Sequence, residues 1–275
     1  MGMCEDCLGK TLPWPGVIHA CYRESRAGTV PVAAMISIHR ALRTWTRMVD
    51  VYIALTEFAR QKFPEGGLPA KRIVTKPNFV HPDPGPGEGQ GGYAMFVGRL
   101  SSEKGVGTLL EAWERLGGRI PLKVVGDGPL ASRMIEASRK PLGIEWLGRR
   151  PLEEVYARMG EARVLIFPSE WYETFGRVAV ESFAKATPAI AANIEAIAEL
   201  ADYERIGFHF RPGDPEDLAA QVERALNSPS ELAVMRREAR AEFESKYTAE
   251  ENYRRLMLPG PCCGRRKRDA QPMYA

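Results

Sequence analysis

Residues 91–116 read GGYAMFVGRLSSEKGVGTLLEAWERL, and this stretch decides the fold class. Its apolar run, Tyr93–Val97, is short and uninterrupted, which is typical of a strand buried on both faces. A glycine and a basic loop follow, and the apolar residues between 106 and 113 then recur at helical spacing. The stretch therefore predicts a buried strand, a loop and a helix in succession.

The same pattern recurs downstream. The further apolar runs are LKVVG (122–126), IEWLG (144–148), VLIFP (164–168) and PAIAA (188–192), and segments with helical spacing separate them. Buried strands that alternate with helices are typical of a parallel sheet with helices on both faces. We therefore predict an α/β fold, with a doubly wound, Rossmann-type domain from residue 93 to residue 247.

The Pro/Gly-rich segment at residues 82–92 predicts a linker, because eight of its eleven residues are Pro or Gly. Before it, a strand at 49–55, a helix at 56–63 and a short strand at 72–75 indicate part of a second α/β unit. The predicted organisation is thus a partial N-terminal domain at 1–81, the linker at 82–92, the main domain at 93–247, a final helix at 248–258 and a disordered basic tail at 259–275.

The composition is that of an ordinary globular protein. Of the 275 residues 44% are hydrophobic and 27% charged, and the net charge is only +3, so nucleic acid is not expected as a partner. Five cysteines are an odd number and argue against a secreted disulfide framework. No run approaches the roughly 20 apolar residues of a membrane span, and no signal-peptide pattern opens the chain. We therefore expect a soluble cytoplasmic protein.

Two loops carry the residues that suit a charged ligand. Ligands of open α/β sheets bind where strands end and helices begin, because backbone N–H groups point outward there. Gly98 and Arg99 follow the first predicted strand, and Lys104 stands at the next helix start, so the two cations suit a diphosphate. The alternative is an ordinary turn with surface charges, and short motifs often mislead in this way.

The second loop follows the strand at 164–168 and contains Glu173, and Glu181 lies eight residues later on the next helix. Carboxylates accept hydrogen bonds from sugar hydroxyls, and the N–H groups of Phe175, Gly176 and Arg177 would face a diphosphate. A nucleotide sugar presents both groups together. The alternative is a helix-start carboxylate at Glu173 and a solvated surface residue at Glu181.

Together these pieces resemble the C-terminal domain of retaining glycosyltransferases of family 4, which have the GT-B fold. The resemblance covers about residues 49–257, and it rests on the order in which a set of short motifs occurs along the chain. These are Gly98-Arg99 with Lys104, then Gly126-Asp127-Gly128-Pro129, then Pro168-Ser169, Glu173, Phe175-Gly176 and Glu181, then Thr187-Pro188. It implies transfer of a hexosyl group from a nucleotide-diphosphate sugar with retention of configuration and without cofactor or metal.

The resemblance also implies roles for single residues. Arg99 and Lys104 would bind the donor diphosphate and stabilise it as it leaves, and the loop from Glu173 to Gly176 would hold the sugar. Glu173 would also stabilise positive charge that develops on that sugar. Glu181 would bind the ribose, and the regions of Gly126 and Leu147 would line the base. The implied acceptor is a polysaccharide or a lipid-linked glycan.

Three departures from the family pattern matter. Ala186 stands where the family has glycine before Thr-Pro, and Glu195-Ala196 replaces a Gly-Gly pair, so this region can differ in shape because only glycine adopts positive φ cheaply. The N-terminal part is also too short for a full GT-B domain. Two alternatives therefore stay open, namely a nucleotide-sugar-binding module without activity and a GT-B nucleotide-sugar epimerase. A two-carboxylate hydrolase would not explain Arg99 and Lys104.

The cysteines near the N-terminus suggest a separate feature. Cys4-x2-Cys7 and His19-x-Cys21 offer four ligands that suit a structural zinc ion, although free cytosolic thiols are the alternative. We assign no role to Cys262 and Cys263. The basic run 265–268 offers peripheral contact with an anionic membrane, but four charges on a tail are more often simply solvated.

Overall fold

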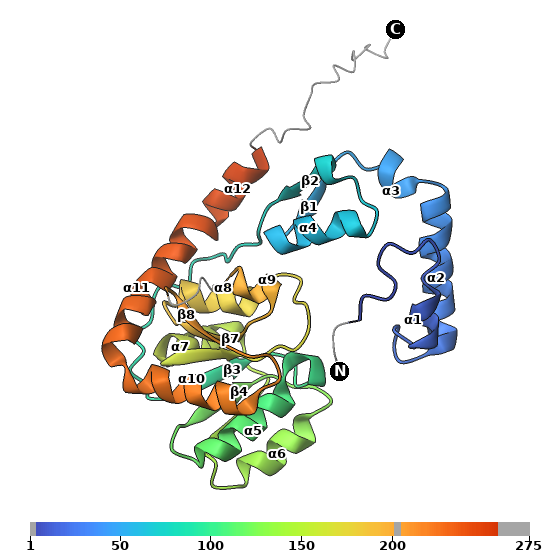
Figure 1. Ribbon diagram of the computed structural model, residues 1–275. Helices are drawn as coiled ribbons and strands as arrows, with labels where there is room; N and C mark the ends of the chain where they lie inside the picture. Colours follow the sequence, from blue (N-terminus) through green and yellow to red (C-terminus); the bar gives the residue numbers. More distant parts are fainter. Residues whose placement is uncertain (1–3, 201–204, 258–275) are drawn as a thin grey trace. The chain divides into compact units, whose positions relative to one another are not determined.

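The computed structural model describes residues 4–200 and 205–257, and these form two compact units (Figure 1). Unit 1 comprises Leu55–Ala59 and the described part of Pro77–Tyr253. Unit 2 comprises Cys4–Ala54, Arg60–Lys76 and the last described residues, 254–257. The predicted basic tail, with Cys262 and Cys263, lies outside the described residues.

Unit 1 is built on a parallel sheet, as the apolar runs predicted. Among the described residues the sheet has six strands in the order β5-β4-β3-β6-β7-β8, and every neighbouring pair is parallel. The strands are β3 (Ala94–Val97), β4 (Leu122–Val125), β5 (Ile144–Gly148), β6 (Val164–Phe167), β7 (Ala189–Ala192) and β8 (Gly207–Phe210). The predicted α/β fold class is confirmed, but the edge strand β8 was not among the predicted strands.

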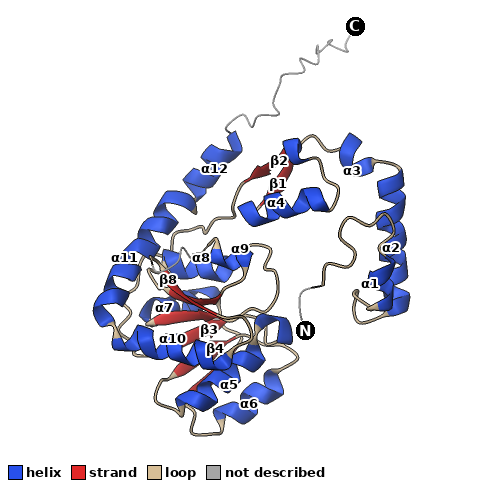
Figure 2. Ribbon diagram, viewed as in Figure 1, coloured by secondary structure: helices blue, strands red, loops and turns tan. Residues whose placement is uncertain are grey.

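Helices cover both faces of this sheet (Figure 2). On one face α5 (Val106–Leu116) packs against α10 (Pro215–Asn227), and on the other α8 (Arg177–Ala184) packs against α7 (Leu152–Glu161) and α11 (Pro229–Lys246). The helix α6 (Ala131–Ser138) lies beside β5. Every residue of β6 and β7 is buried, which explains why their sequences are continuously apolar and do not alternate.

The strand order places a topological switch point between β3 and β6. From β3 the chain continues through α5 to β4 on one side, and from β6 it continues through α8 to β7 on the other. The loops that leave these two central strands therefore diverge at the carboxyl edge of the sheet. This is the position at which open α/β sheets bind their ligands.

The Pro/Gly-rich segment at residues 82–92 contains no helix or strand and lies along unit 1. The N–H groups of Gly87 and Gly89 donate to the carbonyl oxygens of Lys185 and Gly160, both at 2.9 Å. Arg240 on α11 forms an ion pair with Asp83, at 2.5 Å, that lowers the pKa of this aspartate. Nη2 of Arg236 also donates to the Gly87 carbonyl, at 2.7 Å, so the segment is held by its own backbone and by side chains of α11.

Unit 2 contains a two-stranded parallel sheet and helices. Strand β1 (Tyr52–Ala54) pairs with β2 (Ile73–Thr75), and α4 (Glu57–Glu65), part of which belongs to unit 1, follows β1 as the sequence predicted. Before these strands lie α1 (Trp14–Ile18), α2 (Arg26–Ala41) and α3 (Thr44–Arg47). The helix α12 (Ala249–Met257), which belongs to unit 1 up to Tyr253, ends the described chain. None of the helices within the described ranges has the length and apolar character needed to cross a membrane.

The end of α8 shows how the chain tolerates alanine where the family pattern has glycine. Ala186 has a φ of 56°, in the left-handed region. The N–H of Ala186 donates to the Phe183 carbonyl at 2.9 Å, and that of Thr187 donates to the Ser182 carbonyl at 2.7 Å, which are the two hydrogen bonds of a Schellman motif. The turn therefore keeps the conformation that glycine would adopt freely, and Ala186 is strained.

Replacing this alanine by glycine should stabilise the protein. We expect Ala186→Gly to raise the free energy of unfolding by about 0.5–1 kcal/mol, because relief of the left-handed strain exceeds the extra chain entropy of glycine. Thermal unfolding followed by circular dichroism would measure the shift. The same change at Ala184, which is helical and buried, should instead destabilise the protein by roughly 1 kcal/mol. A loss of stability in both variants would contradict this account.

Candidate functional site

The loops after β3 and β4 meet through glycines. Gly126 has a φ of 135°, and a Cβ atom there would overlap the carbonyl oxygen of Gly98. The N–H of Gly98 donates to the carbonyl oxygen of Val125 at 3.0 Å, and the N–H of Gly126 donates to the carbonyl oxygen of Gly148 at 2.9 Å. Only glycine fits this backbone contact, so the sequence at Gly98 and Gly126 fixes how closely the two strand ends approach.

A cavity of about 600 Å³ opens at these strand ends. The residues that line it are Gly98, Arg99, Gly126, Asp127, Gly128 and Arg149. A guanidinium nitrogen of Arg149 lies 3.6 Å from a carboxylate oxygen of Asp127. The wall of the cavity therefore combines bare backbone with two arginines and one carboxylate, which suits an anionic ligand that also carries hydrogen-bonding groups.

The loop after β6 packs on the start of α5. Gly105, the residue before α5, has a φ of 68°, and a Cβ atom there would overlap the carbonyl oxygen of Pro168. The N–H of Glu170 donates to the carbonyl of Glu103 at 3.0 Å, and the hydroxyl of Thr108 donates to the Glu170 carboxylate at 2.5 Å. These contacts join the two loops at the switch point between β3 and β6.

Lys104 and Glu173 form an ion pair across this junction. Lys104 ends the short 3-10 helix η2 (Ser102–Lys104), and its side chain is 31% exposed, whereas the side chain of Glu173 is 14% exposed. The hydroxyl of Ser169 also donates to Glu173, at 2.5 Å. The structure therefore brings together the predicted cation and the predicted carboxylate, and their partial burial strengthens the attraction between them.

The N-terminus of α8 lies directly after this loop. Gly176 precedes the helix with a φ of 77°, and Arg177 is its first residue. Among the described residues no side chain caps this helix start, so its first N–H groups are available to an anion. Phe175 is buried, with its ring edge-on to that of Tyr247, and this packing anchors the turn.

Glu181, one helical turn further along α8, is buried rather than solvated. Its side chain is 8% exposed, and Oε1 lies 2.9 Å from Nε of Arg177 and 3.4 Å from the hydroxyl of Tyr156. Burial raises the pKa of Glu181 above its ordinary value, and Arg177 only partly offsets this effect. Burial, followed by the charge of Glu181, raises the pKa of Tyr156 to about 12.

The structure adds residues that sequence reasoning did not assign to the site. Arg149, Asp127, Ser169 and Tyr156 contact the cavity or the predicted carboxylates, although each belongs to a different loop or helix. Leu147 is half-buried against the core, and its predicted place beside the base stays a prediction, whereas Arg149 lines the cavity two residues later. A strand-end position was the available signal for Arg149, and Ser169 also stood in the Pro168-Ser169 motif of the family resemblance.

Comparisons with known proteins agree with this geometry. Residues 85–242 match the family model described as Glycosyl transferases group 1. The glycogen synthase of Mycobacterium tuberculosis is 31% identical over 254 residues, which are 86% of this chain and 60% of that protein. The phosphatidyl-myo-inositol mannosyltransferase of the same organism is 31% identical over 135 residues, 48% of this chain and 35% of that protein.

Solved structures support the same fold. Anabaena Alr3699/HepE in complex with UDP-glucose has a TM-score of 0.70 at 19% identity, covering 80% of this chain and 66% of that one. Sucrose-phosphate synthase from Thermosynechococcus elongatus has a TM-score of 0.65 at 21% identity, and the match covers 74% of this chain and 57% of that one. The chain spans 60% of the length of the glycogen synthase that it matches. With the expected GT-B fold confirmed and more than half of its residues matched by the family model, this chain belongs to the group 1 glycosyl transferases.

Proposed function

We propose that this chain carries the donor site of a retaining glycosyltransferase that moves a hexosyl group from a nucleotide-diphosphate sugar to an acceptor. One observation carries the proposal: two loops at the switch point bring Lys104 and Glu173 into contact, beside a cavity lined by Arg99. The proposed acceptor is a polysaccharide or a lipid-linked glycan. The two Mycobacterium relatives, a glycogen synthase and a phosphatidyl-myo-inositol mannosyltransferase, support these two classes.

The charges suit departure of a diphosphate. Arg99 would bind it through two parallel hydrogen bonds, Lys104 would act as a compact charge, and the first N–H groups of α8 would add donors. When the donor binds, Lys104 exchanges Glu173 for the diphosphate, and Glu173 becomes free to accept hydrogen bonds from the sugar. The ion pair therefore holds both side chains near their working positions before the donor arrives.

The proposed transfer takes place on one face of the sugar. The bond between the anomeric carbon and the diphosphate oxygen breaks, and a bond from the acceptor hydroxyl oxygen forms on the same face. The acceptor proton passes to the departing diphosphate oxygen, so that no protein nucleophile is required. Glu173 stabilises the positive charge that develops on the sugar, and the two cations stabilise the leaving group.

The nucleoside end would lie over the cavity and the buried pair on α8. Glu181 is proposed to accept hydrogen bonds from the ribose hydroxyls, and Arg177 and Tyr156 hold its carboxylate in place. Arg149 and Asp127 border the space for the base. A carboxylate that already has two partners loses little freedom on binding, which favours affinity.

Calorimetric titration with UDP, GDP and ADP would test the donor site. We expect one nucleotide to bind, and the Arg99→Ala, Lys104→Ala double variant to weaken binding about 100-fold or more, because two charge-assisted hydrogen-bonding groups are lost. The matched control is Arg119→Ala, Lys140→Ala, since these exposed cations precede β4 and β5 and so lie at the opposite edge of the sheet. Equal affinity in both double variants would contradict the assignment.

Product analysis separates the enzymatic alternatives. Transfer to an added glycan or lipid-linked acceptor supports the proposed function, and the anomeric configuration of the product tests retention. Interconversion of the donor sugar would indicate an epimerase instead. Nucleotide binding without either reaction would indicate a binding module.

Replacing Glu173 should separate catalysis from nucleotide binding. We expect Glu173→Gln to lower transfer about 10²–10³-fold, because the amide cannot stabilise developing positive charge. Binding of UDP alone should not weaken, because Lys104 loses a competing partner. Steady-state rates and calorimetry would measure the two effects, with the exposed Glu136→Gln on α6 as control. A parallel loss of UDP binding would show that Glu173 acts by positioning Lys104.

The raised pKa of Glu181 gives the stability a defined pH dependence. Between its ordinary pKa of 4.5 and its raised value, the folded protein holds a proton that the unfolded chain releases. The contribution of Glu181 to the free energy of unfolding therefore falls as pH rises through this window. We therefore compare the free energy of unfolding of the wild type with that of Glu181→Gln, measured by urea denaturation. The value for the wild type minus the value for the variant should decrease from pH 4 toward neutrality. An increase over that range would contradict the assignment.

A further inference from the structure

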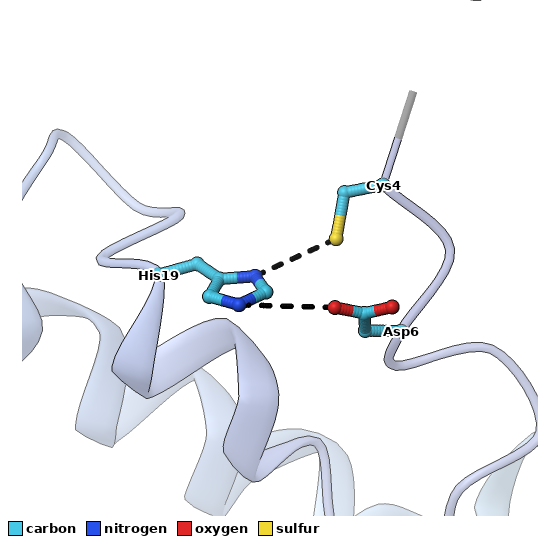
Figure 3. Close-up of side chains that lie close together, drawn as sticks. All are labelled: Cys4, Asp6 and His19. Atoms are coloured by element: carbon cyan, nitrogen blue, oxygen red, sulfur yellow. Dashed lines mark hydrogen bonds and ion pairs between the residues drawn. The ribbon is translucent and has the colours of Figure 1, made fainter. Parts of the chain in front are cut away.

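A cluster of metal-ligating side chains lies in unit 2, in the segment before α2. The Sγ atom of Cys4 is 3.5 Å from Nδ1 of His19, and Nε2 of the same ring is 3.7 Å from Oδ2 of Asp6 (Figure 3). One ligand atom from each of the three residues lies within 4.8 Å of the others. Figure 3 shows Cys4 and Asp6 on one loop, facing opposite nitrogens of the His19 ring at the end of α1.

Two further thiols border the same turn. The Sγ atom of Cys7 accepts a hydrogen bond from the N–H of Gly16 at 3.1 Å. A Cβ atom built at Gly16 would lie 3.4 Å from the sulfur of Cys7 and 3.9 Å from that of Cys21, so both sulfurs approach one glycine. All three cysteines carry free thiols.

We propose that this turn is a structural zinc site in which Cys4, Cys7 and Cys21 supply thiolates and His19 supplies Nδ1. Tetrahedral zinc with Zn–S of about 2.3 Å and Zn–N of about 2.0–2.1 Å places sulfur and nitrogen roughly 3.5 Å apart. The Cys4–His19 separation equals this value. Three thiolates and one imidazole form a closed ligand set, which is typical of structural rather than catalytic zinc.

Asp6 lies outside the ligand set in this arrangement. It faces Nε2, the ring nitrogen opposite the one that faces Cys4. A zinc-bound histidine usually donates its other N–H to a carboxylate, which fixes the tautomer and the ring orientation. Asp6 is therefore a positioning residue for His19. The N–H of Gly16 has the same kind of role toward the sulfur of Cys7.

The segment needs such a crosslink because it has little core of its own. Of the described residues 4–25 only Pro13, Pro15 and Gly16 are buried, whereas Leu12, Trp14 and Ile18 are 61%, 57% and 51% exposed. The helix α1 has only five residues. Segments that bury so little apolar surface commonly depend on a metal or disulfides for their folding free energy.

Metal analysis of the full chain tests the proposal. We expect the protein purified with zinc and dialysed against metal-free buffer to retain one zinc ion per chain by elemental mass spectrometry. Cys4→Ser, Cys7→Ser, Cys21→Ser and His19→Ala should each lose it. His39→Ala, on α2 beside Thr44 and Trp45, and the double variant Cys262→Ser, Cys263→Ser are the matched controls and should retain it. Absence of zinc from the wild type, or its loss from the controls, would overturn the site.

Two measurements keep the test independent of variants that fail to fold. Cobalt substituted into the wild type should give the visible bands of tetrahedral coordination and charge-transfer absorption from thiolates; octahedral spectra would overturn the site. Asp6→Asn should keep one zinc per chain, with affinity lowered about 10–100-fold in competition with a chelator. Complete loss of the metal from Asp6→Asn, as in the cysteine variants, would show instead that Asp6 is a ligand.

Discussion

The backbone contact between Gly98 and Gly126 is the constraint on which the candidate site depends. Because the Gly98 carbonyl leaves no space for a side chain at Gly126, the ends of β3 and β4 approach as closely as two backbones can. That approach leaves a cavity walled by main chain, with Arg99 and Arg149 on its rim. Gly105, pressed against Pro168, brings the β6 loop to the same edge in the same way. Three strand ends thus converge without bulky side chains between them.

Charges at this edge are matched in pairs before any ligand binds. Lys104 pairs with Glu173, Arg177 with the buried Glu181, and Arg149 with Asp127. An uncompensated charge would be costly at Glu173 and Glu181, whose side chains are largely buried, so these two carboxylates need a partner in the free protein. A diphosphate sugar offers both anionic oxygens for the cations and hydroxyls for the carboxylates. Such a ligand can exchange these partners without leaving a buried charge unpaired.

The two units are stabilised by different means. Unit 1 has a continuous core that includes Trp113, Phe183, Phe208 and Phe243, each almost fully buried. Its stability is therefore large enough to tolerate the left-handed alanine at 186. The first part of unit 2 exposes most of its large apolar side chains and buries little. A zinc ion on Cys4, Cys7, His19 and Cys21 would replace the missing hydrophobic contribution there.

The sequence by itself determined the apolar runs, and hence the buried strands, the α/β class and the strand-end positions of Arg99, Lys104 and Glu173. These signals are local, because a continuous apolar run and a helical periodicity each depend only on residues close together in the sequence. Only the tertiary structure decided that β8 completes the sheet, that Glu181 is buried beside Tyr156, and that Arg149 lines the cavity. Those outcomes depend on packing between elements far apart in the chain, which no local pattern encodes.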